Sequence, residues 1–180
     1  MNSYEVAYNL AAAIVNHAEI QALSNEFFGQ EIKVYMDSLG TLDHLDVIDD
    51  NLSEDEKIIA TKNAVYPLLI ISGVAETGGE VAEGETFEVA ARLLVDASMA
   101  KDGTDVDSSK CIRDEKGVFI YARSGNLAKL VEKITDELRD IKAGAIYQDY
   151  SITNELGESY PIQYSEFTVN YKSYQAFKTF

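Results

Sequence analysis

Apolar residues recur at every third or fourth position between residues 124 and 143, in the segment SGNLAKLVEKITDELRDIKA. This spacing places them on one face of an α-helix, while lysine and acidic side chains occupy the opposite face. Ser124 is a suitable N-cap, and Gly144 stands where the end of a helix often needs a left-handed residue. The pattern predicts an amphipathic helix whose apolar face contains Leu127, Leu130, Val131, Ile134, Leu138 and Ile141.

A second segment with helical spacing runs from residue 4 to residue 28. Ser3 is the expected N-cap and Gly29 the expected stop, so we predict one amphipathic helix over this range. Its apolar face contains Ala7, Leu10, Ala11, Ile14, Val15 and Ala18.

Strand patterns lie between the two predicted helices. Residues 31–37 alternate in polarity, residues 66–72 form the continuous apolar run of a strand buried on both faces, and residues 85–96 alternate again. Residues 77–84 contain a glycine-rich turn, so the last two strands form a hairpin. Residues 117–123 are either a short strand or the approach to the second helix.

Two further strands are predicted after the second helix, at residues 145–153 and 160–174. One face of the first contains Ile146, Gln148, Tyr150 and Ile152. In the second, the early apolar residues are out of phase with the later ones, so we expect a bulge or twist near Ser165.

Long polar loops interrupt this pattern at residues 38–57 and 99–116. The first contains seven acidic residues, which makes it the most acidic part of the chain. Near its end, Ser53 followed by Glu56 has the sequence of a capping box, which predicts the start of a short helix.

The order helix, strand, loop, two strands, helix, two strands predicts an α+β fold rather than a parallel βαβ fold. We expect a mostly antiparallel or mixed β-sheet with two amphipathic helices packed on one face. The whole chain, residues 1–180, is expected to be a single domain, since it shows no internal repeat and no linker. A chain of this length can bury roughly 70 % of its unfolded surface.

The chain has 31 acidic and 15 basic residues, a formal charge of −16. Because each phosphate contact needs a Lys or Arg, this charge argues against tight nucleic-acid binding. It is compatible with simple solubility, with a basic partner, with mimicry of DNA, or with a surface that DNA passes without adhering.

The apolar run at residues 10–15 is not preceded by Lys or Arg and is too short to span a bilayer, so we expect neither a signal peptide nor a membrane segment. The single cysteine, Cys111, leaves no partner for an internal disulfide and suits a reducing compartment. We therefore expect a cytosolic protein with no membrane association.

Candidate catalytic and metal-binding residues are few. His17 lies near the apolar face of the first helix, where a structural role is favoured, and His44 stands beside Asp43 and Asp46 without a recognisable zinc spacing. Cys111 has no base placed to lower its pKa. The acidic loops fail the EF-hand pattern, and no phosphate-binding or hydrolase motif is present. We therefore predict no enzymatic activity, no metal and no cofactor.

Tyrosine is abundant, with 11 residues, and several of them fall in the last two strands. Tyrosine suits a half-buried pleated surface and is also common at protein interfaces, so both interpretations stay open. The residues concerned are Tyr147, Tyr150, Tyr160, Tyr164, Tyr171 and Tyr174.

The succession of these elements resembles the tail terminator and tail-completion proteins of tailed bacteriophages and prophages. The resemblance covers most of the chain: the first helix and strand, the acidic loop, the hairpin of YPLLIIS and ETFEVAARLLVDA, the second helix, and the end AIYQDYSITNELGESYPIQYSEFTVNYKSY. In those proteins a helix is typically followed by a strand, a turn and a closing strand that bears aromatic residues.

The resemblance implies a structural protein that forms a six-membered ring on the end of the tail tube, stops its growth and presents a surface to the head. Its expected partners are its own copies in a homo-hexamer, the tail-tube protein and the head–tail connector protein. It would be found in the cytoplasm of the bacterial host and, after assembly, in the virion tail.

A ring of this kind also gives the charge a role. Six subunits would carry a formal charge of −96, six times −16. Acids lining the bore would repel passing DNA within about 8 Å at physiological salt. The candidate acids for this lumen, or for a partner, are Asp43, Asp46, Asp49 and Asp50.

Two other functions fit the sequence. A small acidic inhibitor or DNA mimic would bind a basic partner in a salt-sensitive way, with carboxylates spaced like phosphates along one face. An enzyme that uses carboxylates alone is the third interpretation, but no helix or strand register ties two acids together.

Overall fold

The computed structural model describes residues 1–36, 49–78, 84–96, 99, 112–113, 119–120, 125–153 and 162–173. Its elements follow in the order α1 (Ser3–Val15), α2 (Ala18–Phe28), β1 (Lys33–Met36), α3 (Glu54–Val65), β2 (Leu68–Gly78), β3 (Glu85–Asp96), β4 (Ile112–Arg113), β5 (Phe119–Ile120), α4 (Gly125–Glu137), β6 (Ile146–Thr153) and β7 (Ile162–Ser173).

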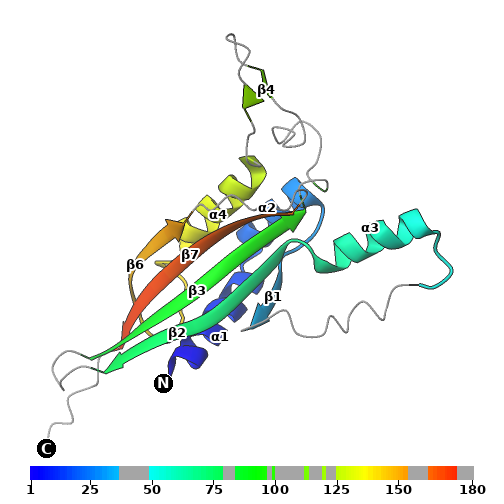
Figure 1. The fold of residues 1–180 in the computed structure, drawn as a ribbon. Coiled ribbons are helices and arrows are strands. Elements are labelled where there is room, and N and C mark those ends of the chain that lie inside the picture. The colour runs from blue at the N-terminus through cyan, green and yellow to red at the C-terminus, as the bar shows by residue number, and fades with distance from the viewer. Residues whose placement is uncertain are drawn as a thin grey trace, which may run out of the picture.

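Five strands form one sheet in the order β1-β2-β3-β7-β6 (Figure 1). β1 runs parallel to β2, and each other neighbouring pair of this sheet is antiparallel. β4 and β5 pair with each other as a separate two-stranded ladder. The predicted α+β class with a mostly antiparallel sheet is confirmed, and the sheet is mixed because of β1.

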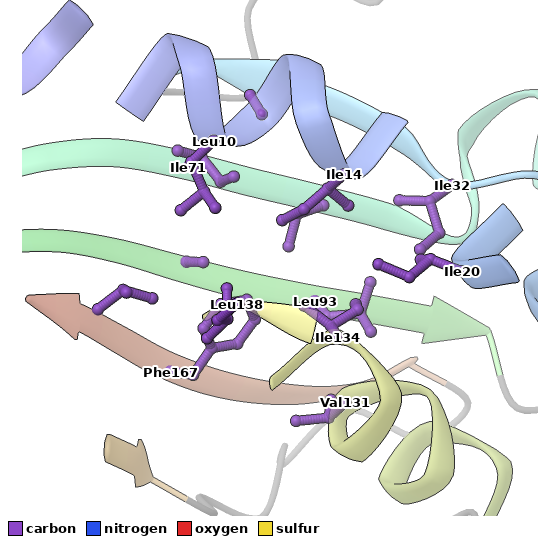
Figure 2. Close-up of a cluster of buried hydrophobic side chains, with 14 of the residues drawn as sticks. Leu10, Ile14, Ile20, Ile32, Ile71, Leu93, Val131, Ile134, Leu138 and Phe167 are labelled. Atoms are coloured by element: carbon purple, nitrogen blue, oxygen red, sulfur yellow. The ribbon is translucent and has the colours of Figure 1, made fainter. Parts of the chain in front are cut away.

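One hydrophobic cluster joins side chains of α1, α2 and α4 to the sheet (Figure 2). On β3 and β7 every second residue is buried, and cross-strand partners such as Val89 and Val169 share the buried face. Figure 2 shows Leu10 of α1 beside Ile71 of β2, and Leu138 beside Phe167 of β7. Each large side chain that is fully buried in such a cluster contributes about 1.5–3 kcal/mol.

The helix α4 confirms the predicted amphipathic segment. All six residues of its predicted apolar face are buried. The helix ends at Glu137, so Leu138 and Ile141 belong to the turn that follows, in which the N–H of Ile141 donates to the Glu137 carbonyl at 3.1 Å. Gly144 is left-handed, with φ +83°, but it shapes the entry into β6 instead of capping the helix. The expected N-cap, Ser124, lies outside the described residues.

The prediction of a single helix over residues 4–28 is wrong, because α1 and α2 are separate helices. The side chain of Asn16 donates to a carbonyl oxygen in the last turn of α1 at 2.7 Å and ends that helix. His17 is the N-cap of α2, not a residue on a helical face. The chain changes direction at this break, so Val15 and Ala18 are exposed and leave the predicted apolar face.

The ends of these two helices are capped by short-range hydrogen bonds. Asn2 caps α1 in a capping box with Glu5, so the expected cap at Ser3 is one residue too late. Gly29, with φ +74°, ends α2 in the left-handed conformation, as predicted. The buried members of the predicted face are Ala7, Leu10, Ala11 and Ile14.

The predicted bulge near Ser165 is wrong. β7 pairs with β3 from Ile162 to Ser173 without a register shift. Ile162 and Tyr164 alternate regularly onto the face opposite Phe167, and Tyr164 lies 5.0 Å from the guanidinium carbon of Arg92, which packs over its ring. Apolar residues therefore occupy both faces of this strand near its start, and no irregularity is needed.

The register shifts occur elsewhere, in the middle of β2 and near the start of β6. In β6 the shift skips Gln148, so the predicted shared face of this strand is only partly correct. Tyr150 and Ile152 lie opposite buried residues of β7, whereas Ile146 lies opposite Lys172 on the other face.

The loop predictions are partly confirmed. Ser53 and Glu56 form the predicted capping box, but α3 begins at Glu54 and continues for 12 residues, so the acidic loop ends earlier than residue 57 and the helix is not short. β5 lies within residues 117–123 and confirms the short-strand alternative there. β4 falls inside the predicted loop at residues 99–116 and was not predicted. The rest of the predicted loops and turns, at residues 37–48, 79–83, 100–111 and 154–160, lies outside the described residues.

Candidate interaction surfaces

The helix α3 projects from one end of the sheet, beside the end of β3 (Figure 1). Only its last residue, Val65, is buried. Ile58 and Ile59 keep 54 % and 58 % of their surface exposed. Ile58 and Ile59 are thus two adjacent large apolar side chains exposed on a projecting helix, which makes this helix a candidate surface for a partner.

Polar contacts anchor the base of α3 to the sheet. The ammonium of Lys62 lies 3.3 Å from a carboxylate oxygen of Asp96, whose side chain is only 2 % exposed. Lys33 of β1 donates to the backbone carbonyls of Asn63 at 2.6 Å and Tyr66 at 2.9 Å. These contacts all lie in or after the last turn of α3, so they fix the base of the helix.

Burial shifts the pKa values of two groups in this anchor. It lowers the pKa of the Lys33 ammonium, against a smaller opposing effect of Glu31. Burial also raises the pKa of the Tyr66 hydroxyl, and the carboxylate of Asp96 adds to that increase. Both effects show that the anchor lies in a partly dehydrated environment, where its hydrogen bonds are stronger than at an open surface.

The opposite, free end of α3 is acidic. Asp49 and Asp50 precede the helix and are exposed, and Asp49 accepts hydrogen bonds from the backbone and side-chain nitrogens of Asn51 at 2.9 and 2.8 Å. Asp43 and Asp46 lie outside the described residues. Of the four candidate acids, the structure therefore places Asp49 and Asp50 together at the tip of α3.

The first turn of α3 adds more acids to this tip. Glu54, Asp55 and Glu56 occupy it, where acidic side chains favour the helix N-terminus. Hydrogen bonds from the side chain and backbone of Ser53 lower the pKa of Glu56. Glu54 and Asp55 lie next to Ile58 and Ile59 one turn on, and we call these four side chains the arm surface.

A second exposed surface lies near the N-terminus, where several residues remain outside the core. Tyr4 and Tyr8, one turn apart on α1, are 51 % and 57 % exposed. They continue onto a hollow of about 720 Å³ between the end of α4 and the start of β6. We call the following residues the N-terminal patch: Met1, Tyr4, Glu5, Tyr8, Arg139, Asp140, Lys142, Ile146 and Lys172.

Two contacts hold the parts of this patch together. The side chain of Asn9 donates to the backbone carbonyl of Ala143 at 3.2 Å. Gly144 has φ +83°, a backbone conformation that favours glycine, and a Cβ there would lie 3.0 Å from the ends of the Asn9 and Met1 side chains, so this turn lies close to the start of α1. The tyrosines of α1 and the cations around the hollow therefore form one continuous surface.

A third surface follows β6, which forms one edge of the described sheet. Tyr150 and Ile152 remain exposed and line a hollow of about 230 Å³ against α4. Glu132 and Asp136 of α4 line the same hollow. This surface therefore combines apolar side chains with negative charge.

His17 has a structural position. Its Nδ1 caps α2, and its Nε2 lies 3.5 Å from a carboxylate oxygen of Glu137. Lys133 bridges Glu19 and Glu137 at 2.5 Å each, which raises the pKa of Lys133 and lowers that of Glu137. His17 thus helps to join α2 to the end of α4, as the favoured structural interpretation predicts, and it meets no nucleophile here.

The described residues give no support to the metal-binding and cysteine candidates of the sequence. No group of three or more His, Cys, Asp or Glu side chains in the described part of the chain is placed to hold a metal ion. His44 and Cys111 lie outside that part.

Some of the tyrosines have a structural role in the sheet, and others are exposed where a partner could bind. Tyr171 is buried and meets Tyr147 edge-on, with ring centres 6.4 Å apart, which is a structural role. Tyr150 is exposed at the sheet edge. Tyr160 and Tyr174 lie outside the described residues. Sequence reasoning missed the exposed Tyr4 and Tyr8, although their spacing of four residues on the polar side of the first helix was a readable signal.

Comparison with known proteins adds no assignment. No protein-family model matches the chain, and no curated protein matches it. Among the described helices, none is long and apolar enough to cross a membrane.

Proposed function

We propose that this chain is a structural assembly protein of a phage or phage-like tail, which ends the tail tube and joins it to the head as a ring of identical subunits. The observation that carries the proposal is α3. A helix of 12 residues is marginal in water by itself, yet α3 stands away from the core with Ile58 and Ile59 exposed. A partner that covers this helix would supply the missing stabilisation.

The assignment to a tail rests on the resemblance of element order. The hairpin of β2 and β3, the helix α4 and the closing pair β6 and β7 follow one another in the order typical of tail terminator proteins. The described chain departs from the expected order at three places: its first helix is broken, the 12-residue helix α3 precedes the hairpin, and the β4–β5 ladder stands between the hairpin and α4. The end of the chain, α4 followed by β6 and β7, keeps the expected order.

The proposed partners are further copies of the chain, with six in a ring, together with the tail-tube protein and the head–tail connector protein. Asp49 and Asp50 lie at the tip of α3 in an exposed position. If this tip faces the bore, its carboxylates repel the phosphates of passing DNA and keep the channel free of adhering nucleic acid. Assembly takes place in the bacterial cytoplasm, and the ring then stays in the virion tail.

Deletion of the gene from the phage or prophage that carries it tests the proposal. Negative-stain electron microscopy of the lysate should show tails of excessive and variable length that lack heads, and the gene supplied from a plasmid should restore joined particles. Tails of normal length joined to heads in the deletion would refute the proposal, as would a gene neighbourhood without capsid, connector and tail-tube genes.

The acidic tip of α3 also favours a second candidate function, that of a small acidic inhibitor or DNA mimic. Five acids, Asp49, Asp50, Glu54, Asp55 and Glu56, fall within eight residues there. Such a protein would capture a basic partner in a pull-down at low salt and release it at high salt. It would leave tail length unaffected, so the deletion experiment separates the two functions.

A further inference from the structure

The arm surface and the N-terminal patch lie at opposite ends of the sheet. α3 leads into the start of β2, where Leu68 pairs with Leu94 of β3. The patch residue Lys172 pairs with Thr86, near the other end of β3. Eight residues of β3 separate Thr86 from Leu94, a distance of about 27 Å at about 3.4 Å per residue. One copy of the chain therefore cannot bring its own arm surface onto its own patch.

The two surfaces are complementary in chemistry. The arm surface combines the carboxylates of Glu54 and Asp55 with two exposed isoleucines. The patch combines exposed aromatic and aliphatic side chains with the cations Arg139, Lys142 and Lys172 around an open hollow. Two acids, Asp140 in the hollow and Glu5 beside Tyr4 and Tyr8, offset part of this charge, so three cations stand against two acids and the patch stays net positive. Each surface thus offers an apolar area with adjacent charges, and the net charges of the two surfaces have opposite signs.

The hollow beside β6 does not suit the arm surface. It also has exposed apolar residues, but Glu132 and Asp136 line it. The acids of α3 would meet like charges there, and a negatively charged chain gains nothing from such a contact. Of these two apolar surfaces, the N-terminal patch is therefore the one whose charge suits the arm surface.

We infer that the arm surface of one copy docks on the N-terminal patch of a second copy, in a head-to-tail contact between subunits. The inference rests on the proposed function, because it supplies the contact by which the ring would form. The two faces of the contact differ, so every copy uses one of each, and the chain of contacts ends only when the last copy meets the first.

Charge reversal on each side tests the contact. Glu54→Lys with Asp55→Lys reverses the arm surface, and Arg139→Glu with Lys142→Glu reverses the patch. Sedimentation velocity at high protein concentration should show multimers of the wild-type chain and only the 19.9 kDa monomer for each variant alone. An equimolar mixture of the two variants should restore multimers, because each arm then meets a patch of opposite charge.

A matched variant controls for net charge. Glu132→Lys with Asp136→Lys changes the charge by the same amount as the arm variant, on an exposed part of α4. It should associate like the wild type. The circular dichroism spectrum and melting temperature of every variant should stay close to the wild-type values, which shows that lost association is not lost folding.

Crosslinking captures the contact even if it is weak. In a Cys111→Ser background, a chain with Ile59→Cys is mixed with a chain with Ile146→Cys and treated with a short bismaleimide. A crosslinked dimer should appear in this mixture, at a yield several-fold above that obtained when Val74→Cys replaces Ile146→Cys. Val74 is a suitable control because its exposed fraction, 54 %, is close to that of Ile146, 51 %.

The outcomes separate this inference from the proposed function. Association that survives both reversals, a mixture that fails to restore it, or equal crosslinking at Val74 and Ile146 would overturn the contact. A wild-type chain that neither associates nor crosslinks at Ile59 and Ile146 would overturn it too. Overlong tails in the gene deletion would still support the tail assignment in each of these cases.

Discussion

Replacing Tyr171 with phenylalanine should make the protein more stable. Tyr171 is 0 % exposed, and its hydroxyl has no hydrogen-bond partner among the described residues. A buried hydroxyl without a partner costs about 1–3 kcal/mol, because it loses its hydrogen bonds to water on folding. Tyr171→Phe removes this group and keeps the ring in its contact with Tyr147. We therefore expect a gain of about 1–3 kcal/mol in the free energy of unfolding.

Urea unfolding followed by far-UV circular dichroism measures this gain. The midpoint should rise while the slope m stays unchanged, and the melting temperature should increase by about 2–4 °C for each kcal/mol. Tyr147→Phe is the matched control, since Tyr147 is only partly buried and its loss of a hydroxyl should change stability by less than about 0.5 kcal/mol. A Tyr171→Phe variant that is less stable than the wild type would show that the hydroxyl has a partner and would refute the reasoning.

The same hydroxyl should affect stability at high pH. Burial raises the pKa of Tyr171 above the ordinary value of a tyrosine, about 10. Above pH 10 the unfolded chain therefore loses this proton before the folded chain does, and the free energy of unfolding falls as the pH rises. Tyr171→Phe should make this decline shallower in urea titrations between about pH 9 and pH 11. An unchanged slope would mean that Tyr171 titrates normally.

Three further substitutions test other parts of the fold. Gly84→Ala should lower the free energy of unfolding by more than about 2 kcal/mol, because φ is +73° and a Cβ would overlap the carbonyl group of Ser173. Gly78→Ala is the control: no atom lies within 4 Å of the added carbon, so the urea midpoint should change little. Leu130→Ala should cost about 2–5 kcal/mol by leaving a cavity under α4, and a smaller loss by urea unfolding would place Leu130 outside the core. Ser53→Ala should remove the capping box and lower the stability of α3 by about 0.5–2 kcal/mol. Hydrogen exchange should speed up in the first turns of α3 only, because the other end of the helix is held to the sheet. Slower folding, or exchange changes throughout the sheet, would contradict this.

Hydrophobic periodicity predicted α4 and the strands well, because their buried faces are formed almost wholly by apolar residues. It failed at the break between α1 and α2, which is spanned by a buried polar side chain: the amide nitrogen of Gln21 donates to the carbonyl of Val15 at 3.0 Å. Gln21 is buried and accepts the N–H of Ile32 at 2.7 Å through its side chain, and Ser24 donates to the carbonyl of Gln30 at 2.7 Å. These polar residues satisfy the backbone of the connection to β1, and no apolar pattern marks them.

The candidate surfaces were predicted less completely than the fold. The capping box at Ser53 marked the beginning of α3, but nothing in the spacing of Ile58 and Ile59 tells whether they are buried or exposed. The cations of the N-terminal patch come from the end of α4 and from β7, which are far apart in the sequence. Only the pairing of β6 with β7 brings Lys172 beside the turn that carries Arg139 and Lys142.

A closed ring built from the inferred head-to-tail contact requires every contact to have the same geometry, and the anchor of α3 favours this. Heterologous contacts close only if each subunit is turned by the same angle relative to the last. That angle is constant only if α3 keeps one direction relative to the sheet, and a helix joined by a flexible loop would not keep it. Lys62 holds the last turn of α3 to the buried carboxylate of Asp96, and Lys33 holds the two carbonyls at the end of the helix. These polar contacts fix the direction of α3 relative to the sheet, which the inferred contact needs.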